Sequence, residues 1–193
     1  MTFFAFIRHG QTDWNRDGRL QGSSDIPLNH TGREQAHAAV ANVADEQWDA
    51  IVSSPLSRAR ETAEILAAGL GIELGPAYPQ LVERSFGQAE GADIADIARR
   101  WPNRDYPGYE SDEAVVERGR AALTEIARDY GDDARVLVVC HGSLIRLTLG
   151  ALGGQDVPSI DNAAVSTFRT IADDGWEVLS INGETLASVD GVR

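Results

Sequence analysis

The chain has 193 residues, with 17 basic and 30 acidic side chains and a net charge of −13. This length suits one domain with a sizeable core, and the acidic balance argues against nucleic acid or an anionic membrane as a partner. The single cysteine, Cys140, excludes an internal disulfide, and the sequence shows neither a secretion signal nor a stretch of membrane-spanning length. We therefore expect a cytoplasmic protein whose oligomeric state is open.

The first predicted element is a buried strand over Phe3–Ile7, which runs directly into Arg8, His9 and Gly10. Ligands bind at the carboxyl ends of strands in open α/β sheets. At such an end, Arg8 offers a planar donor fork suited to phosphate, and a histidine can act as a nucleophile. Gly10 lets the backbone approach a ligand closely.

A helix and a second strand follow. The capping-box spacing of Thr31–Glu34 predicts a helix that extends to about Trp48. The apolar run Ala50–Val52 predicts a strand, and a turn after it leads into a helix over residues 57–68. This arrangement places Arg58 in the first turn of that helix.

The middle of the chain adds a carboxylate and a pair of helices. Residues 79–82 predict a strand that ends at Glu83. Residues from about 90 to 128 hold two helical patterns, which are split by the Trp- and Pro-containing stretch 101–108. We interpret the region 90–128 as a lid-like insertion over the strand ends.

A second strand that ends in His-Gly lies near the C-terminus. The apolar run Val136–Cys140 leads into His141 and Gly142, and residues 144–149 predict a helix. The N-terminus of that helix would lie beside the imidazole, with free backbone N–H groups suited to an anion.

Two further strands are predicted over residues 163–172 and 176–181, joined by a hairpin-type turn at 173–175. The last residues, 187–193, are expected to fray. The alternation of strands and helices predicts a three-layer α/β/α fold with a mostly parallel central sheet and a small helical lid, in a single domain over 1–193.

The strand ends deliver two histidines, two arginines and one carboxylate to one edge of the predicted sheet. Arg8, Arg58 and one histidine would neutralise a phosphoryl group, and the other histidine, kept neutral, would attack phosphorus in line. Glu83 would protonate the leaving oxygen and then help to remove a proton from water. The residues alone do not say which of His9 and His141 is the nucleophile that attacks phosphorus. Guanidinium donors that are held in place can stabilise the negative charge on the phosphoryl oxygens without a metal.

The motifs closely resemble those of the histidine phosphatase superfamily, in the branch that is similar to cofactor-dependent phosphoglycerate mutase. They occur in the family's order and span nearly the whole chain. The matching segments are Arg8–Asn15, Arg19–Gly22, Asp25–Leu28, Ser53–Ala59, Leu81–Gly87 and His141–Gly142.

The resemblance implies a role for each matched residue. His9 would be the nucleophile, which passes through a phosphohistidine, and Glu83 would be the general acid and base. Arg8, Arg58 and His141 would hold the phosphoryl group. The pocket would be lined also by Asn15, Gln21, Gly22 and Gly142. We expect the ring nitrogen of His9 that does not attack to donate to a nearby carbonyl, which would fix the tautomer.

The sequence favours a phosphatase that acts on a small phosphate ester, with no cofactor and no metal. Family mutases are longer between the acid and the second histidine, and they use a paired-arginine segment there for the substrate carboxylate. The pair Arg99-Arg100 lies in that region, but we interpret it mainly as lid surface. A phosphoglycerate mutase is the main alternative; a phosphoprotein phosphatase and a non-enzymatic phospho-ligand binder rank lower.

Four other residues carry separate expectations. Ala89 stands where the common phosphatase pattern has an aromatic residue, and Tyr109 stands where it has a glycine, so both bear on substrate preference. Arg118 is interpreted as a structural, salt-bridged arginine. Asn162 is expected either to cap a turn or to approach the pocket, and we favour the cap.

Overall fold

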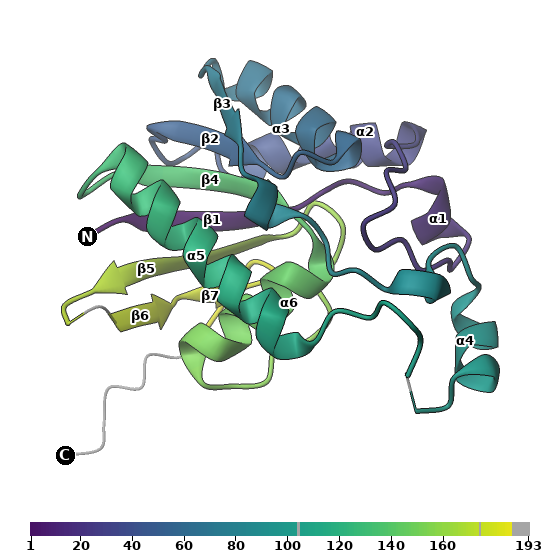
Figure 1. The fold of residues 1–193 in the computed structure, drawn as a ribbon. Coiled ribbons are helices and arrows are strands. Elements are labelled where there is room, and N and C mark those ends of the chain that lie inside the picture. The colour runs from purple at the N-terminus through teal and green to yellow at the C-terminus, as the bar shows by residue number, and fades with distance from the viewer. Residues whose placement is uncertain (104, 174, 187–193) are drawn as a thin grey trace.

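The computed structural model describes residues 1–103, 105–173 and 175–186, and its centre is a six-stranded sheet (Figure 1). The strands of this sheet are β1 (Phe3–Arg8), β2 (Ala50–Ser53), β3 (Leu74–Ala77), β4 (Arg135–Cys140), β5 (Val165–Ile171) and β6 (Gly175–Val178). Their order is β3-β2-β4-β1-β5-β6. The first four strands pair in parallel, whereas β5 and β6 pair antiparallel. A separate small sheet consists of β7 (Ser180–Ile181) and β8 (Glu184–Thr185).

Helices connect and cover these strands. The α-helices of the described residues are α1 (Asp13–Arg16), α2 (His30–Ala39), α3 (Ser57–Leu70), α4 (Ile94–Arg100), α5 (Asp112–Tyr130) and α6 (Gly142–Gly153). Short 3₁₀ turns are η1 (Val40–Asn42), η2 (Pro79–Leu81) and η3 (Gly87–Ala89).

The two faces of the sheet are covered by different helices (Figure 1). On one face, Leu123 of α5 and Leu144 of α6 pack in the same core as Phe6 of β1. On the other face, Leu66 of α3 packs in a core with Ile7. Successive side chains of a strand point to opposite faces, so β1 contributes to both cores. The expected three-layer α/β/α fold with a mostly parallel sheet is confirmed.

Backbone meets backbone immediately after β1. A side chain at Gly10 would collide with the carbonyl of Gly32 in α2, and a side chain at Gly32 would collide with the backbone of Gln11. The N–H of Gly10 also donates to Thr62 Oγ1 of α3 at 3.1 Å. Glycine at these two positions therefore seats the chain against α2 and α3, which fixes the direction in which His9 leaves the strand.

The prediction of a strand over residues 79–82 is wrong. The edge strand β3 ends at Ala77, and η2 follows it. Pro79 has no N–H for a sheet ladder, and its fixed φ suits the first position of a helical turn. Glu83 therefore follows a turn rather than a strand.

The helix predicted over residues 31–48 is shorter and starts earlier. Asn29 is the N-cap residue of α2, and its side chain accepts the N–H of the third helical residue at 2.8 Å. The helix ends at Ala39 and tightens into η1. Trp48 lies beyond the helix, where its indole N–H donates to the carbonyl of Val43 at 2.8 Å.

The region beyond the strand ends is smaller than the predicted 90–128. α5 packs in the core against the sheet through fully buried side chains such as Ile126. Residues 84–103 and 105–111, here called the 84–111 segment, include α4, which lies beyond the carboxyl ends of β1 and β4 (Figure 1). Only this segment fits the position expected of a lid.

The two ends of the 84–111 segment are joined by hydrogen bonds. The N–H of Glu110 donates to the carbonyl of Ser85 at 2.9 Å. The N–H of Ser85 donates in turn to Glu110 Oε2 at 3.0 Å. Arg118 of α5 donates to Glu110 Oε1 at 2.7 Å, which confirms its interpretation as a salt-bridged arginine. The segment is therefore a closed loop anchored on α5.

The C-terminal strands match the expectation in part. β5 lies within the predicted 163–172, but the strand predicted over 176–181 is divided into β6, which begins already at Gly175, and β7, which belongs to the small separate sheet. Residue 174 of the predicted turn and the tail 187–193 lie outside the described residues. No helix of the described chain is long and apolar enough to cross a membrane.

Candidate active site

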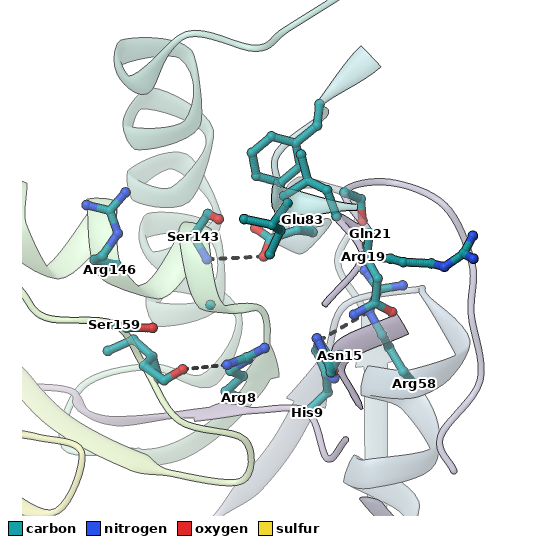
Figure 2. A pocket seen from close by; sticks show the side chains of 16 residues that line it. Arg8, His9, Asn15, Arg19, Gln21, Arg58, Glu83, Ser143, Arg146 and Ser159 are labelled. Carbon is teal, nitrogen blue, oxygen red and sulfur yellow. Dashed lines mark hydrogen bonds between the residues drawn. The ribbon is translucent and has the colours of Figure 1, made fainter. Parts of the chain in front are cut away.

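The carboxyl ends of β1 and β4 and the N-termini of α3 and α6 meet around a cavity of about 200 Å³ (Figure 2). Eight of the nine residues expected at the site line this cavity; they are Arg8, His9, Asn15, Gln21, Gly22, Arg58, Glu83 and Gly142. The ninth, His141, is fully buried, and its ring centroid lies 5.2 Å from that of His9. The structure thus brings together residues that are far apart in the sequence.

The two ring nitrogens of His9 differ in their protonation, because one donates a hydrogen bond and the other accepts one. Its Nδ1 lies 2.7 Å from the carbonyl oxygen of Gly10, which can only accept, so Nδ1 carries the proton. Its Nε2 accepts the Nε–H of Arg58 at 3.2 Å. Burial, together with the positive charges of Arg58 and Arg8, holds the pKa of His9 well below its usual range. His9 is therefore neutral near pH 7, with its lone pair on Nε2, and the expected carbonyl contact is confirmed.

Arg58 is fully buried and held by backbone carbonyls. Its Nη1 donates to the carbonyl of Ser24 at 2.7 Å, and its Nη2 donates to that of Gly22 at 2.8 Å. Burial lowers the pKa of Arg58 to about 10, so it remains a cation near pH 7. The guanidinium is thereby fixed in one orientation beside His9.

Glu90, from the 84–111 segment, holds the loop whose carbonyls receive Arg58. Its carboxylate accepts the backbone N–H and the hydroxyl of both Ser23 and Ser24, at 2.5 to 3.0 Å. Gly22 has φ +57°, and a side chain there would collide with Glu90. Burial alone would raise the pKa of Glu90, but these hydrogen bonds and one from Phe86 lower it below its usual range.

Arg8 is the second cation of the cavity, and its side chain is partly buried. Its Nη1 donates to the carbonyl of Ile160 at 2.6 Å, whereas its buried Nε has no hydrogen-bond partner among the described residues. Burial lowers the pKa of Arg8, and the negative charges of Glu83 and Asp161 oppose that shift. A side chain at Gly142 would come within 3.3 Å of the Arg8 Nε, so glycine there leaves this donor uncrowded.

His141 lies beneath the cavity, at the N-cap position of α6. Its Nε2 is 2.8 Å from Ser54 Oγ, and its buried Nδ1 has no partner among the described residues. The Ser54 hydroxyl already accepts the N–H of Leu56 at 3.3 Å, so its own proton can go to Nε2. His141 then carries its proton on Nδ1. Burial, followed by the charge of Arg58, lowers the pKa of His141 well below its usual range.

Glu83 is fixed against the N-terminus of α6. Its carboxylate accepts the backbone N–H groups of Ser143 at 3.1 Å and of Leu144 at 3.2 Å (Figure 2). The N–H of Arg84 adds a third hydrogen bond, at 2.8 Å. The turn before Glu83 is held by Arg118, whose Nη1 donates to the carbonyls of Gln80 and Val82.

Asn162 belongs to the site, although the sequence interpretation favoured a turn cap over an approach to the pocket. Its amide donates to the carbonyl of His9 at 2.9 Å, and the same amide lies 3.4 Å from Asn15 Oδ1. It therefore supports the backbone of His9 instead of only capping a turn. The sequence carries no signal for this contact, because Asn162 and His9 are far apart in the chain. They come close where Asn162 precedes β5 and His9 follows β1, the strand with which β5 pairs.

Cys140 and metal binding complete the description of the site. Cys140 is fully buried at the end of β4, and burial raises the pKa of its thiol, so it packs as a small hydrophobic residue. Within the described ranges, no group of three or more His, Cys, Asp or Glu side chains is placed to hold a metal ion.

The chain is similar in sequence to several known proteins. The chain is 36% identical over 187 residues to the "Uncharacterized phosphatase PhoE" of Bacillus subtilis (strain 168), with 94% of this chain and 95% of that protein covered. It is 33% identical over 187 residues to "Phosphoglycerate mutase-like protein 4" of Arabidopsis thaliana, with 89% and 81% covered. It is 30% identical over 190 residues to the "Metal-independent phosphoserine phosphatase" of the same plant, with 91% and 79% covered.

The fold is also shared with a solved structure. The mycobacterial glucosyl-3-phosphoglycerate phosphatase Rv2419c, in complex with VO3, superimposes with a TM-score of 0.85 at 29% identity, covering 93% of this chain and 98% of that one. A family model for the histidine phosphatase superfamily (branch 1) matches residues 4–184. The resemblance drawn from the motifs is confirmed, and the chain belongs to the histidine phosphatase superfamily.

Proposed function

We propose that the chain is a metal-independent phosphomonoesterase that acts on small phosphorylated metabolites through a phosphohistidine at His9. The observation that carries this proposal is the neutral His9, whose unprotonated Nε2 lies beside the buried Arg58 and close to Arg8 and His141. A lone pair on nitrogen beside fixed cationic donors suits in-line attack on a phosphoryl group.

In the first step, Arg8, Arg58 and the Nδ1–H of His141 donate to the non-bridging oxygens of the bound phosphoryl group. The Arg58 Nε–H, which meets His9 Nε2 in this structure, turns to one of these oxygens and frees the lone pair. His9 Nε2 forms a bond to phosphorus as the bond to the ester oxygen breaks. The protonated Glu83 gives its proton to that oxygen, and the alcohol leaves.

In the second step, water attacks the phosphohistidine. The Glu83 carboxylate takes a proton from this water, the P–N bond breaks, and orthophosphate leaves with the neutral His9 restored. The hydrogen bonds from α6 hold Glu83 in one position for both proton transfers. Donors fixed before the reaction need no reorganisation in the transition state, which is the main catalytic benefit in phosphoryl transfer.

Two observations favour a hydrolase over a mutase. The side chain of Arg99 is 77% exposed and pairs with Asp96, and Arg100 lies over the Trp101 ring at 4.4 Å, so neither arginine of the pair lines the cavity. The stretch between Glu83 and His141 is also shorter than the corresponding stretch in the mutases of this family. The small cavity and the substrates in the relatives' names, phosphoserine and glucosyl-3-phosphoglycerate, support small phosphate esters.

The proposal is tested by phosphate release from a panel of phosphomonoesters, including 3-phosphoglycerate, by wild type and His9→Ala with EDTA present. Wild type should release phosphate from part of the panel, and His9→Ala should release none. Release by both proteins would refute His9 as the nucleophile, and a loss of release on adding EDTA would refute the metal-free mechanism. If nothing is released but phosphoryl exchange occurs between the two phosphoglycerate isomers, the chain is a mutase.

A further inference from the structure

Arg146 is a cation of the cavity that the proposed mechanism does not use. It lies on α6, one turn after Ser143, and lines the cavity apart from the cluster of Arg8, His9 and Arg58 (Figure 2). Its guanidinium has no hydrogen bond, ion pair or ring contact with any described residue. By contrast, Arg8 and Arg58 both donate to backbone carbonyls. Arg146 therefore has its full donor set available for an anion.

A second cavity of about 450 Å³ begins where the first one ends. The two cavities share the lining residues Leu20, Phe86, Ile94, Ser143 and Arg146. The second continues beneath the 84–111 segment, where Trp101 and Tyr109 line it. Because Ser143, whose N–H donates to Glu83, lines both cavities, a phosphate monoester bound at His9 would extend its alcohol into this second cavity.

The junction of the two cavities is largely apolar. Ile94 lines both cavities and is 57% exposed. Phe86 and Leu20 also line both cavities and are only partly buried. A ligand with an apolar body would cover these side chains, and such burial contributes about 25 cal/mol per Å².

We propose that the second cavity is the leaving-group subsite, and that it takes an alcohol with an apolar body and an anionic group that Arg146 binds. This inference rests on the proposed function and names its substrate class: phosphate monoesters of apolar hydroxy acids or of apolar diols with a second phosphate. The planar guanidinium fork binds a carboxylate or a phosphate through two parallel hydrogen bonds. Ile94 and Phe86 exclude water beside it, which strengthens that pairing.

Matched esters test the role of Arg146. The substrates are 3- and 4-carboxyphenyl phosphate, their carboxamide analogues, and 1,3- and 1,4-phenylene bisphosphate; the proteins are wild type, Arg146→Met and Arg146→Lys. Wild type should favour at least one anionic ester over its carboxamide by about 10- to 100-fold in kcat/KM, as expected for a charge-assisted hydrogen bond. Arg146→Met should abolish that preference, mainly through KM, with carboxamide turnover kept. Arg146→Lys should restore part of it.

Other results would overturn the assignment. No preference in wild type, or an equal loss for anionic and carboxamide esters in Arg146→Met, means that Arg146 binds no substrate anion. A matched control is Arg99→Met, which removes an exposed arginine of α4 outside both cavities and should leave the preference intact. The carboxylate and bisphosphate arms distinguish the two kinds of anion.

The apolar part of the proposal has its own variant. Ile94→Ser changes an exposed side chain, so the fold should be kept, and it should reduce the preference for benzyl phosphate over ethyl phosphate by about fivefold. An unchanged preference would show that the alcohol does not contact Ile94.

The subsite can also be tested without turnover. Calorimetric titration of His9→Ala with the same carboxylate and carboxamide esters should show the carboxylate binding more tightly, and Arg146→Met in that background should remove the difference. If wild type releases no phosphate yet this difference is present, the proposed hydrolase fails and the subsite stands. If phosphate is released but the difference is absent, the subsite fails and the hydrolase stands.

Discussion

The phosphoryl end and the leaving-group end of the pocket come from different parts of the fold. At the phosphoryl end, Arg58 and His141 are fully buried and Arg8 is partly buried, and all three stand on the strand ends and helix N-termini of the central layers. At the leaving-group end, the walls come mostly from the 84–111 segment, which has its own small core around Ala89, Ile97 and Tyr106. The comparison supports our proposal that the central layers carry the phosphoryl chemistry, while a separate segment selects the alcohol.

The largest expected effect is at the phosphoryl end. Arg58→Met removes a phosphoryl donor and leaves the carbonyls of Gly22 and Ser24 unpaired. We expect kcat/KM to fall on the order of 10³-fold for every substrate, with a loss of about 1–3 kcal/mol in the free energy of unfolding. Steady-state kinetics and urea unfolding measure the two effects. Arg58→Lys should recover little, because lysine lacks the fork; a fall below tenfold in the Met variant would contradict the assignment.

Glu83 stands where the two ends meet, so its effect should depend on the alcohol. Glu83→Gln removes the transferable proton and keeps an oxygen for only one of the two α6 N–H groups, because these donate to different carboxylate oxygens. We expect kcat to fall about 10²- to 10³-fold for alkyl phosphates and much less for 4-nitrophenyl phosphate, whose leaving group needs little protonation. A plot of log kcat against the leaving-group pKa should become steeper. A parallel shift of that plot would count against proton transfer by Glu83.

Glu90 links the two ends, because it belongs to the 84–111 segment and yet holds the loop that receives Arg58. Glu90→Gln places an amide NH₂ against N–H and O–H donors. We expect kcat/KM to fall about tenfold, by the same factor for small and large alcohols, because the change acts through Arg58. Glu61→Gln, which affects a partly exposed ion pair with Arg33 of α2, is the control. A loss confined to large alcohols would place the effect of Glu90 at the leaving-group end.

The smallest expected effect is a pH dependence of stability at the phosphoryl end. The pKa values of His9 and His141 are lowered in the folded protein, first by burial and then by Arg58. Below the ordinary histidine pKa of about 6.5, these histidines bind protons in the unfolded chain but not in the folded chain. The free energy of unfolding therefore decreases as the pH falls. His9→Asn should reduce this slope by up to about 1.4 kcal/mol per pH unit.

Urea unfolding at pH 7, 6 and 5 measures this slope. His37→Asn, at an exposed position of α2, is the control and should leave the slope unchanged. An unchanged slope in His9→Asn as well would show that His9 takes up a proton in the folded state as readily as in the unfolded chain.

The same division explains what the sequence could predict. Arg8, His9 and His141 directly follow apolar runs, so the strand ends and the charges at the phosphoryl end could be predicted from local pattern. Glu83 could be identified as the carboxylate of the site. The apolar residues before it resembled a strand, but Pro79 favours a helical turn there.

The contacts of Asn162 and Glu90 depend on side-chain hydrogen bonds between distant segments, and local periodicity carries no information about such bonds. Arg146 has the same limitation. In the sequence it is one polar residue of a predicted helix. It lines the leaving-group end because α4 and α6 contribute side chains to the same cavity.

The hydrogen-bonded ends of the 84–111 segment have a consequence for protein engineering. Because Ser85 and Glu110 bond to each other and Arg118 anchors them, the loop between them can be exchanged as one cassette with a related phosphatase without moving the sheet. A graft would need to keep a carboxylate at the position of Glu90, which holds the loop that receives Arg58. It would also need to keep the backbone hydrogen bonds that join residues 91–94 to Gly18 and Leu20. Under these constraints, we expect new substrate preferences to arise from the exchange of one loop.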